Sequence, residues 1–282
     1  MSRGVGYALA AGLLFACMDA ASKKLGQDYP VLQILWVRFV PLALISAWLA
    51  ARQHVRGLVS RHFWLQSLRS LLFVTEIGVF VFAISILPLA DAHAMMAVAP
   101  LLVTALSVPL LGERVGIRRW TAVGIAFVGV LIILRPGFGT LQPVSLLPLL
   151  AAAMWALYQV LTRIVTRSDP PLTTLFYSVI LGTVGLTLLV PFVWRAPDLV
   201  AWALLAFAAI TGACGHYLLI MALQLTPAAI LQPLSYMVLV WATLVGFVVF
   251  GDLPDLPTVL GAAVIAASGL YVVARERRLA RG

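Results

Sequence analysis

The feature that most constrains this chain is the stretch 88–137, in which two apolar runs flank a short charged turn. The first run, Ala92–Gly112, contains no Asp, Glu, Lys or Arg, and it is long enough to cross the ~30 Å hydrocarbon core of a bilayer as a helix. The second run, Trp120–Leu134, is shorter, but Arg119 and Arg135 at its ends can extend to the two membrane surfaces. The stretch is therefore predicted to form a helical hairpin in lipid.

The same pattern recurs 139 residues later. With this offset Pro88 falls on Pro227, and the Gly112-Glu113 turn falls on Gly251-Asp252. Because self-similarity at a fixed offset marks an architecture of repeated units, we expect two related halves, residues 1–140 and 141–282.

Composition and hydropathy predict an all-α integral membrane protein. Hydrophobic residues make up 63% of the chain and charged residues 10%, whereas a soluble domain is nearer half apolar and a quarter charged. Short connections leave no room for a water-soluble domain, which disfavours most enzymes. We expect ten transmembrane helices, roughly Val5–Lys23, Val31–Ala51, Arg69–Leu87, Ala92–Leu111, Trp120–Leu134, Val144–Arg163, Leu172–Trp194, Leu199–Leu223, Pro227–Phe250 and Thr258–Ala274.

The distribution of Lys and Arg predicts the orientation. With the N-terminus in the cytoplasm, fourteen of these residues, Arg69 among them, lie in cytoplasmic segments and four lie outside. Both termini are therefore expected to be cytoplasmic, in the cell inner membrane. Five spans per half is an odd number, so the second half is inverted relative to the first. Inverted repeats are typical of secondary transporters with a substrate site near the bilayer midplane.

Several short segments resemble a known family. They are Leu35-Trp36-Val37-Arg38-Phe39, Leu87-Pro88-Leu89-Ala90, Ala99-Pro100-Leu101-Leu102, Leu111-Gly112-Glu113-Arg114, and the pair Gly124 and Gly129. Together they resemble the drug/metabolite transporter superfamily, and within it the EamA-type ten-helix transporters, over nearly the whole chain. The resemblance implies transport of small metabolites, often amino acids and commonly outward, as in the YddG-like amino-acid exporters. Asp252 departs from the Glu that this family often has.

Three charged side chains lie within the expected spans, where they are costly unless they face the bundle interior or a cavity. Asp19 is expected either to line a cavity or to pair with Lys23 or Arg38. Arg38 can receive a substrate carboxylate through its forked donors, or it can pair with Asp19 or Glu76. Glu76 can exchange a proton during transport, or it can be a neutral, hydrogen-bonded core residue.

Aromatic and amide side chains complete the expected cavity wall: Trp155, Tyr158, Gln159, Tyr177, Gln232, Tyr236 and Trp241. The alternative for each is ordinary helix packing. His216 is a candidate for the same cavity, although it is also interpreted as a hydrogen-bonded core histidine, and His93 is expected at the outer interface. Pro41, Pro100 and Pro227 are expected to interrupt their helices, because proline cannot donate the backbone hydrogen bond.

The main hypothesis is an inner-membrane secondary transporter, an amino-acid exporter that works by alternating access through a central cavity. The alternatives are uptake of a nucleoside-derived metabolite and a membrane-embedded transferase. The expected partners are a small molecule and the lipid bilayer, with protons as a candidate coupling ion and no nucleic acid. No metal site and no cofactor is expected, because the sequence has no paired His/Cys spacing and no Gly-rich phosphate loop. The oligomeric state is open, and a monomer is compatible with this architecture.

Overall fold

The computed structural model describes residues 2–52, 60–112, 116–135, 143–169, 171–225, 234 and 236–279, and it is helical with short connections. The α-helices are α1 (Ser2–Leu25), α2 (Val31–Arg52), α3 (Phe63–Ile86), α4 (Leu89–Met96), α5 (Ala99–Leu111), α6 (Ile117–Leu134), α7 (Leu147–Val165), α8 (Pro171–Leu189), α9 (Leu199–Leu225), α11 (Met237–Phe250) and α12 (Leu256–Leu279). Two short 3-10 helices, η2 (Pro143–Leu146) and η3 (Val190–Phe192), precede α7 and follow α8.

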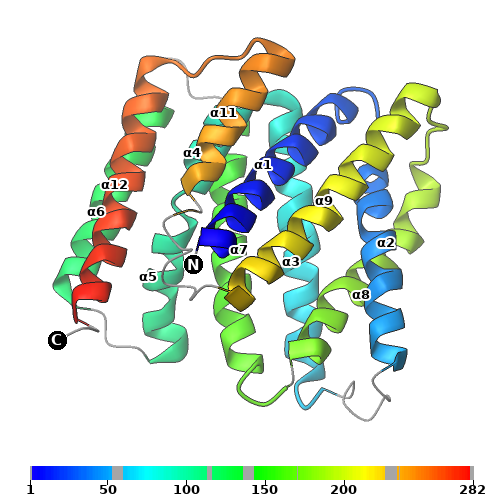
Figure 1. Ribbon diagram of the computed structural model, residues 1–282, viewed down its shortest axis with the longest axis horizontal. Coiled ribbons are helices and arrows are strands. Elements are labelled where there is room, and N and C mark those ends of the chain that lie inside the picture. Colours follow the sequence, from blue (N-terminus) through cyan, green and yellow to red (C-terminus); the bar gives the residue numbers. More distant parts are fainter. Residues whose placement is uncertain are drawn as a thin grey trace.

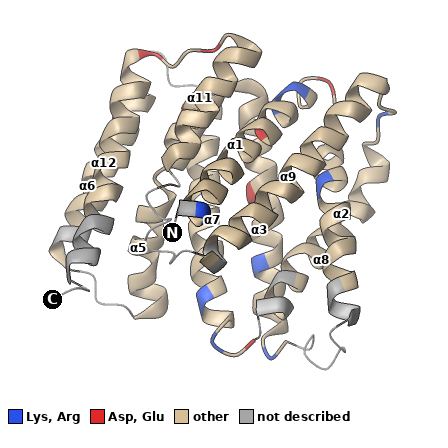
Figure 2. Cartoon of the chain, in the orientation of Figure 1, with Lys and Arg blue, Asp and Glu red and all other residues tan. Residues whose placement is uncertain are grey.

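The apolar helices follow the ten expected spans in order. Within the described ranges, six segments are long and apolar enough to cross a membrane, counting α4 and α5 as one, and four shorter apolar helices accompany them. Charged positions gather at helix ends and in loops, while the middles of the helices carry few of them (Figure 2). The third span begins six residues earlier than expected, at Phe63. Arg69 therefore lies inside a helix, where its side chain is fully buried, and not in a cytoplasmic loop.

The helix contacts repeat with the 139-residue offset, which maps α1 on α7, α3 on α9 and α5 on α11. α1 packs against α9 and α11, and in the same way α7 packs against α3 and α5. Two further pairs, α2 with α8 and α6 with α12, join equivalent helices and lie at opposite ends of the molecule's long axis (Figure 1). The packing of α1 in one half thus has a counterpart in the packing of α7 in the other, with the halves exchanged.

The α6–α12 pair is held at backbone distance by two glycines. A Cβ added to Gly129 would lie 2.8 Å from the carbonyl oxygen of Gly261, and a Cβ added to Gly261 would lie 2.5 Å from that of Gly129. Small residues at a helix interface allow this approach in membranes. By contrast, a Cβ on Gly124, also on α6, would meet nothing within 4 Å.

The fourth span is broken in the middle, between α4 and α5. Pro100 stands in the first turn of α5 and has no N–H for the carbonyl of Met96. The chain turns tightly through Ala97 and Val98, where the Val98 N–H donates to Met95 O at 3.3 Å and the Leu101 N–H donates to Val98 O at 3.0 Å.

The other two prolines gave different outcomes. α2 continues through Pro41, so the expected interruption there is wrong. A transmembrane helix can tolerate the loss of the single backbone hydrogen bond that proline removes. Pro227 lies outside the described residues.

Candidate functional site

A cavity of about 350 Å³ lies at the centre of the bundle, where α1, α3, α4, α5, α7, α9 and α11 meet beside Arg38 of α2. Its volume falls within the range of small-molecule sites, which combine an apolar lining with a few polar groups. The charged, imidazole and aromatic residues that line it are Asp19, Arg38, Glu76, His93, His216, Phe15, Phe73, Phe80, Trp155 and Tyr236.

Helical spacing places these side chains. On α3, Phe73, Glu76 and Phe80 follow at intervals of three and four residues, so they share one face. Asp19 likewise lies on the side of α1 that faces the cavity. Both carboxylates are nearly enclosed by protein, since Asp19 is 6% exposed and Glu76 is 4% exposed.

The charges in the cavity are close but incompletely paired. Asp19 Oδ2 lies 3.3 Å from His93 Nε2, close enough for an ion pair if the imidazole is protonated. Within the described chain, Arg38 makes two hydrogen bonds, both to neutral atoms: Nη1 donates to Ser22 Oγ at 3.1 Å and Nη2 donates to Met18 Sδ at 3.0 Å. The carboxylates of Asp19 and Glu76 line the same cavity as Arg38. The cavity therefore offers acidic and basic groups to a dipolar ligand.

The helix break opens onto this cavity. Met96, Ala97, Ala99 and Pro100, on both sides of the break, are among its lining residues. Tyr236, the residue that precedes α11, lines it from the second half. Interrupted helices whose backbone faces the substrate site are characteristic of transporter folds.

One wall of the cavity consists of two aromatic rings, Phe73 and Trp155, and a third ring, Tyr158, packs on both of them without lining the cavity. Tyr158 stacks on Phe73, with centroids 5.0 Å apart and planes at 21°, and on Trp155, with centroids 5.3 Å apart and planes at 22°. Phe73 and Trp155 lie 6.2 Å apart and line the cavity, whereas Tyr158 supports them from behind. Such a wall can receive a flat ring by offset stacking.

Six of the expected cavity residues do line the cavity: Asp19, Arg38, Glu76, Trp155, His216 and Tyr236. The structure places four others away from it. Tyr158 lies behind the aromatic wall, and Gln159, the next residue on α7, is exposed on another side of the helix. Tyr177 packs against Phe63 at 6.1 Å. The Trp241 indole packs on Gly12, with its Nε1 buried. Gln232 lies outside the described residues.

Sequence reasoning missed Phe73 and Phe80 as cavity residues, and it placed His93 at the outer interface. The spacing of Phe73, Glu76 and Phe80 on one helix face was the available signal. His93 lies on α4, beside Asp19 and edge-on to Phe80 at 5.0 Å. It was misplaced because its partner stands far away in the sequence.

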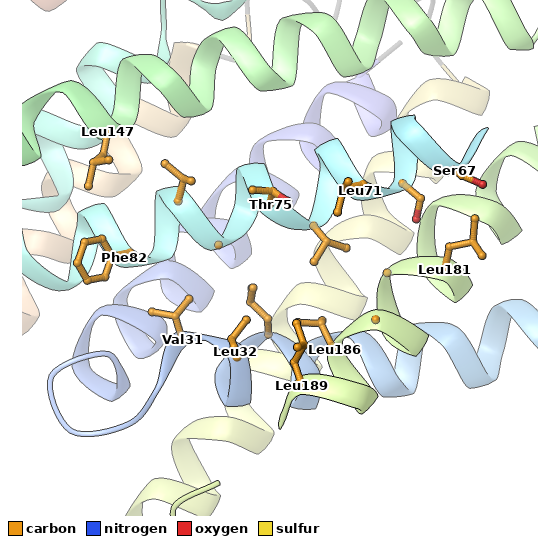
Figure 3. A pocket seen from close by; sticks show the side chains of 17 residues that line it. Val31, Leu32, Ser67, Leu71, Thr75, Phe82, Leu147, Leu181, Leu186 and Leu189 are labelled. Atoms are coloured by element: carbon orange, nitrogen blue, oxygen red, sulfur yellow. The ribbon is translucent and has the colours of Figure 1, made fainter. Parts of the chain in front are cut away.

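A second hollow, of about 560 Å³, has a different character. It is a groove between α2, α3 and α8, lined by leucine, valine and phenylalanine side chains, three glycines and three hydroxyl residues (Figure 3). Ser70 is occupied internally, because its Oγ donates to Ser178 O at 3.1 Å. Leu71 and Phe82 at the rim are exposed on the outside of the bundle. The groove contains no charged residue, so the central cavity is the candidate substrate site.

The model of the EamA-like transporter family matches residues 2–135 and again residues 142–274. The chain belongs to the EamA-like transporter family. This EamA-like protein is therefore a multi-pass membrane transporter, and the alternative of a membrane-embedded transferase is wrong.

Relatives of this EamA-like protein align over most of its length. A riboflavin transporter of Vibrio cholerae is 28% identical over 99% of this chain and 95% of its own. A riboflavin transporter of Brucella anthropi is 27% identical over 97% and 99%. An S-adenosylmethionine uptake transporter of Rickettsia bellii is 25% identical over 98% and 95%. A protein of known crystal structure, 21% identical, covers 99% of both chains with a TM-score of 0.64, which shows a shared fold.

Proposed function

We propose that this EamA-like transporter takes up a small metabolite that carries a planar heteroaromatic ring. The observation that carries the proposal is the central cavity, which is lined both by an aromatic wall and by a group of acidic and basic side chains. The wall suits a flat ring, and Asp19, Arg38 and Glu76 suit the polar substituents attached to it. Riboflavin and S-adenosylmethionine, the substrates in the relatives' names, both join such a ring to a hydroxylated chain or sugar.

Amino-acid export, the main hypothesis from the sequence, receives no support from these relatives. The alternative reading, uptake of a nucleoside-derived metabolite, fits them better. The two hypotheses differ in what the substrate needs: an aliphatic amino acid requires charged partners alone, whereas a ring-bearing metabolite also requires the aromatic wall.

The mechanism that we propose is alternating access in the inner membrane, with both termini cytoplasmic. Residues 1–140 and 141–282 act as inverted repeats, which move against each other around the central cavity. Support comes from the exchanged helix contacts, α1 with α9 and α7 with α3, and from two separate family matches, one in each half.

The deciding test is counterflow into liposomes that contain the purified protein, at two pH values, with labelled riboflavin, S-adenosylmethionine and a panel of amino acids. We expect saturable exchange of a ring-bearing compound, which unlabelled amino acids do not compete away. Exchange of amino acids alone would overturn the proposal in favour of the first hypothesis. A pH dependence that Glu76→Gln abolishes would identify protons as the coupling ion.

Two phenylalanines on α3 provide a matched pair of variants. Phe73 lines the cavity, whereas Phe82 lines the outer groove and is 48% exposed. Because a stacked aromatic pair contributes about 0.5–1.5 kcal/mol, we expect Phe73→Leu to raise the KM for the ring-bearing substrate by about 2–10-fold. Phe82→Leu should leave this KM unchanged. Equal effects of the two substitutions on KM would show that the aromatic wall does not contribute to substrate binding.

A further inference from the structure

Arg69 is a fully buried arginine in the first half of α3, with 0% of its surface exposed. A guanidinium has five N–H donors in a fixed fork, and the structure gives each of them an acceptor. Nε and Nη2 both donate to Gln66 Oε1, at 3.1 and 2.7 Å. Nη2 also donates to Thr174 O. Nη1 donates to Tyr158 Oη at 3.1 Å and to Thr162 Oγ1 at 3.3 Å.

These acceptors are all neutral, and the compensating charge is one side chain further away. Gln66 Nε2 donates to Asp169 Oδ2 at 3.0 Å, so Gln66 connects the guanidinium to a carboxylate. Buried charges persist where such a network satisfies them. With all five donors in use, Arg69 has none left for a substrate, and it is absent from the cavity lining. Its role in substrate recognition is therefore indirect.

The contact with Tyr158 connects Arg69 to the cavity. The guanidinium carbon lies 5.1 Å from the centre of the Tyr158 ring, in addition to the hydrogen bond with its hydroxyl. The tyrosine ring in turn stacks on Phe73 and Trp155, both of which line the cavity. Phe73 also stands four residues after Arg69, on the same face of α3. Arg69, with all five donors engaged, thus contacts Tyr158, which in turn stacks on the two rings that line the cavity.

We propose that Arg69 is a positioning residue that sets the affinity for planar ring-bearing substrates by fixing Tyr158, and through it the aromatic wall. The inference rests on the proposed function, and it adds the residue that orients the recognition surface without touching the substrate. A ring in fixed orientation loses less conformational freedom when the substrate stacks on it.

Two conservative substitutions test the proposal, because each removes one acceptor from the same nitrogen, Nη1. Tyr158→Phe keeps the ring but removes the hydroxyl that Arg69 holds. Thr162→Val removes the neighbouring hydroxyl, which also donates to the Tyr158 backbone carbonyl at 2.7 Å, and keeps the hydrogen bond between Arg69 and the tyrosine side chain. The full-length protein is reconstituted in liposomes, with riboflavin as the ring-bearing probe. Trp155 emission is isolated, without ligand, by subtracting the spectrum of a matching Trp155→Phe variant.

We expect Tyr158→Phe to raise the KM for riboflavin by about 3–10-fold with Vmax unchanged, the range of an aromatic contact, and to shift the Trp155 emission. Thr162→Val should change neither quantity. If both variants change both quantities equally, or if Tyr158→Phe changes neither, Arg69 only stabilises the fold and the proposal is overturned.

The emission measurement also separates this inference from the proposed function. If the wild-type protein exchanges no ring-bearing compound, the proposed function fails, and the shift of Trp155 emission then decides the positioning role by itself. An unshifted spectrum of Tyr158→Phe would overturn the inference, and a shifted one would retain it for whichever substrate the cavity takes.

Discussion

Two arginines in the transmembrane helices, Arg38 and Arg69, have very different surroundings. Arg69 is completely buried and donates all five of its N–H groups to protein acceptors. Arg38 borders the central cavity, is partly exposed, and makes two hydrogen bonds to neutral atoms within the described part of the chain. The count of engaged donors therefore distinguishes an arginine that holds structure from one that is available to a ligand.

The counter-charges differ as well. Asp19 and Glu76 line the same cavity as Arg38, so a substrate group that enters the cavity can meet all three side chains. Asp169 reaches Arg69 only through Gln66, and it is itself fixed by the backbone N–H of Arg61 at 3.1 Å. Removing Arg69 should therefore affect folding first, while removing Arg38 should affect transport first.

The largest effect on stability is expected for Arg69→Gln. The substitution leaves buried acceptors on α7 and α8 without a donor, which costs about 3 kcal/mol or more. Thermal unfolding in detergent should show a Tm lower by roughly 6–12 °C, or a loss of folded protein. A Tm within about 2 °C of the wild-type value would contradict the description of Arg69 as structural.

Arg38→Gln should reduce transport strongly and stability only moderately. It loses two hydrogen bonds to neutral acceptors, so the expected destabilisation is about 1–2 kcal/mol. Transport of the ring-bearing substrate should fall by about tenfold or more, because a charged partner of the ligand is lost. Counterflow and Tm are measured on the same preparation. If stability falls as far as in Arg69→Gln, the two arginines do not differ as proposed.

A smaller loss of stability than for Arg69→Gln is expected for Asp169→Asn, which keeps the shape of the side chain but removes the charge behind Gln66 and replaces one of two acceptor oxygens by an NH2 group. Hydrogen bonds to a charged acceptor are stronger than those to a neutral one, so we expect a loss of about 1–2 kcal/mol in unfolding free energy. Asp198→Asn is the matched control, since this exposed carboxylate accepts from the Ala201 N–H at 2.7 Å and asparagine caps a helix equally well. Equal Tm values for the two variants would show that the charge of Asp169 does not matter to Arg69.

The helices and much of the cavity were predictable from local sequence, because apolar length and helical spacing are local properties. The ten spans follow from runs such as Ala92–Gly112, and Pro100 marked the position of the break, although the same missing N–H at Pro41 leaves α2 continuous. Trp155, Glu76 and Asp19 were expected in the cavity because polar and aromatic groups within a span turn toward protein.

Partners distant in the sequence were not predictable in this way. Lys23 was considered as a partner of Asp19 on the same helix, but its Nζ lies 2.7 Å from Asp252 Oδ2, 229 residues away. Arg69 was assigned to a surface segment because the rule for charged loops contains no information about the acceptors on α7 and α8. Likewise, spacing on α11 and α7 indicates a face, but only the neighbouring helices determine whether that face meets the cavity, as for Trp241 and Gln159.

The glycine contact between α6 and α12 has a practical consequence for following the transport cycle. Because Gly129 and Gly261 each lie against the other's carbonyl group and against an isoleucine side chain of the facing helix, these two helices cannot approach further, and sliding would drive a side chain into a carbonyl group. Spin labels on the outward faces of α6 and α12 should therefore report one constant distance while labels around the cavity report several. The distance between the α6 and α12 labels can serve as a fixed internal reference for measuring the opening and closing that alternating access would require of the remaining helices.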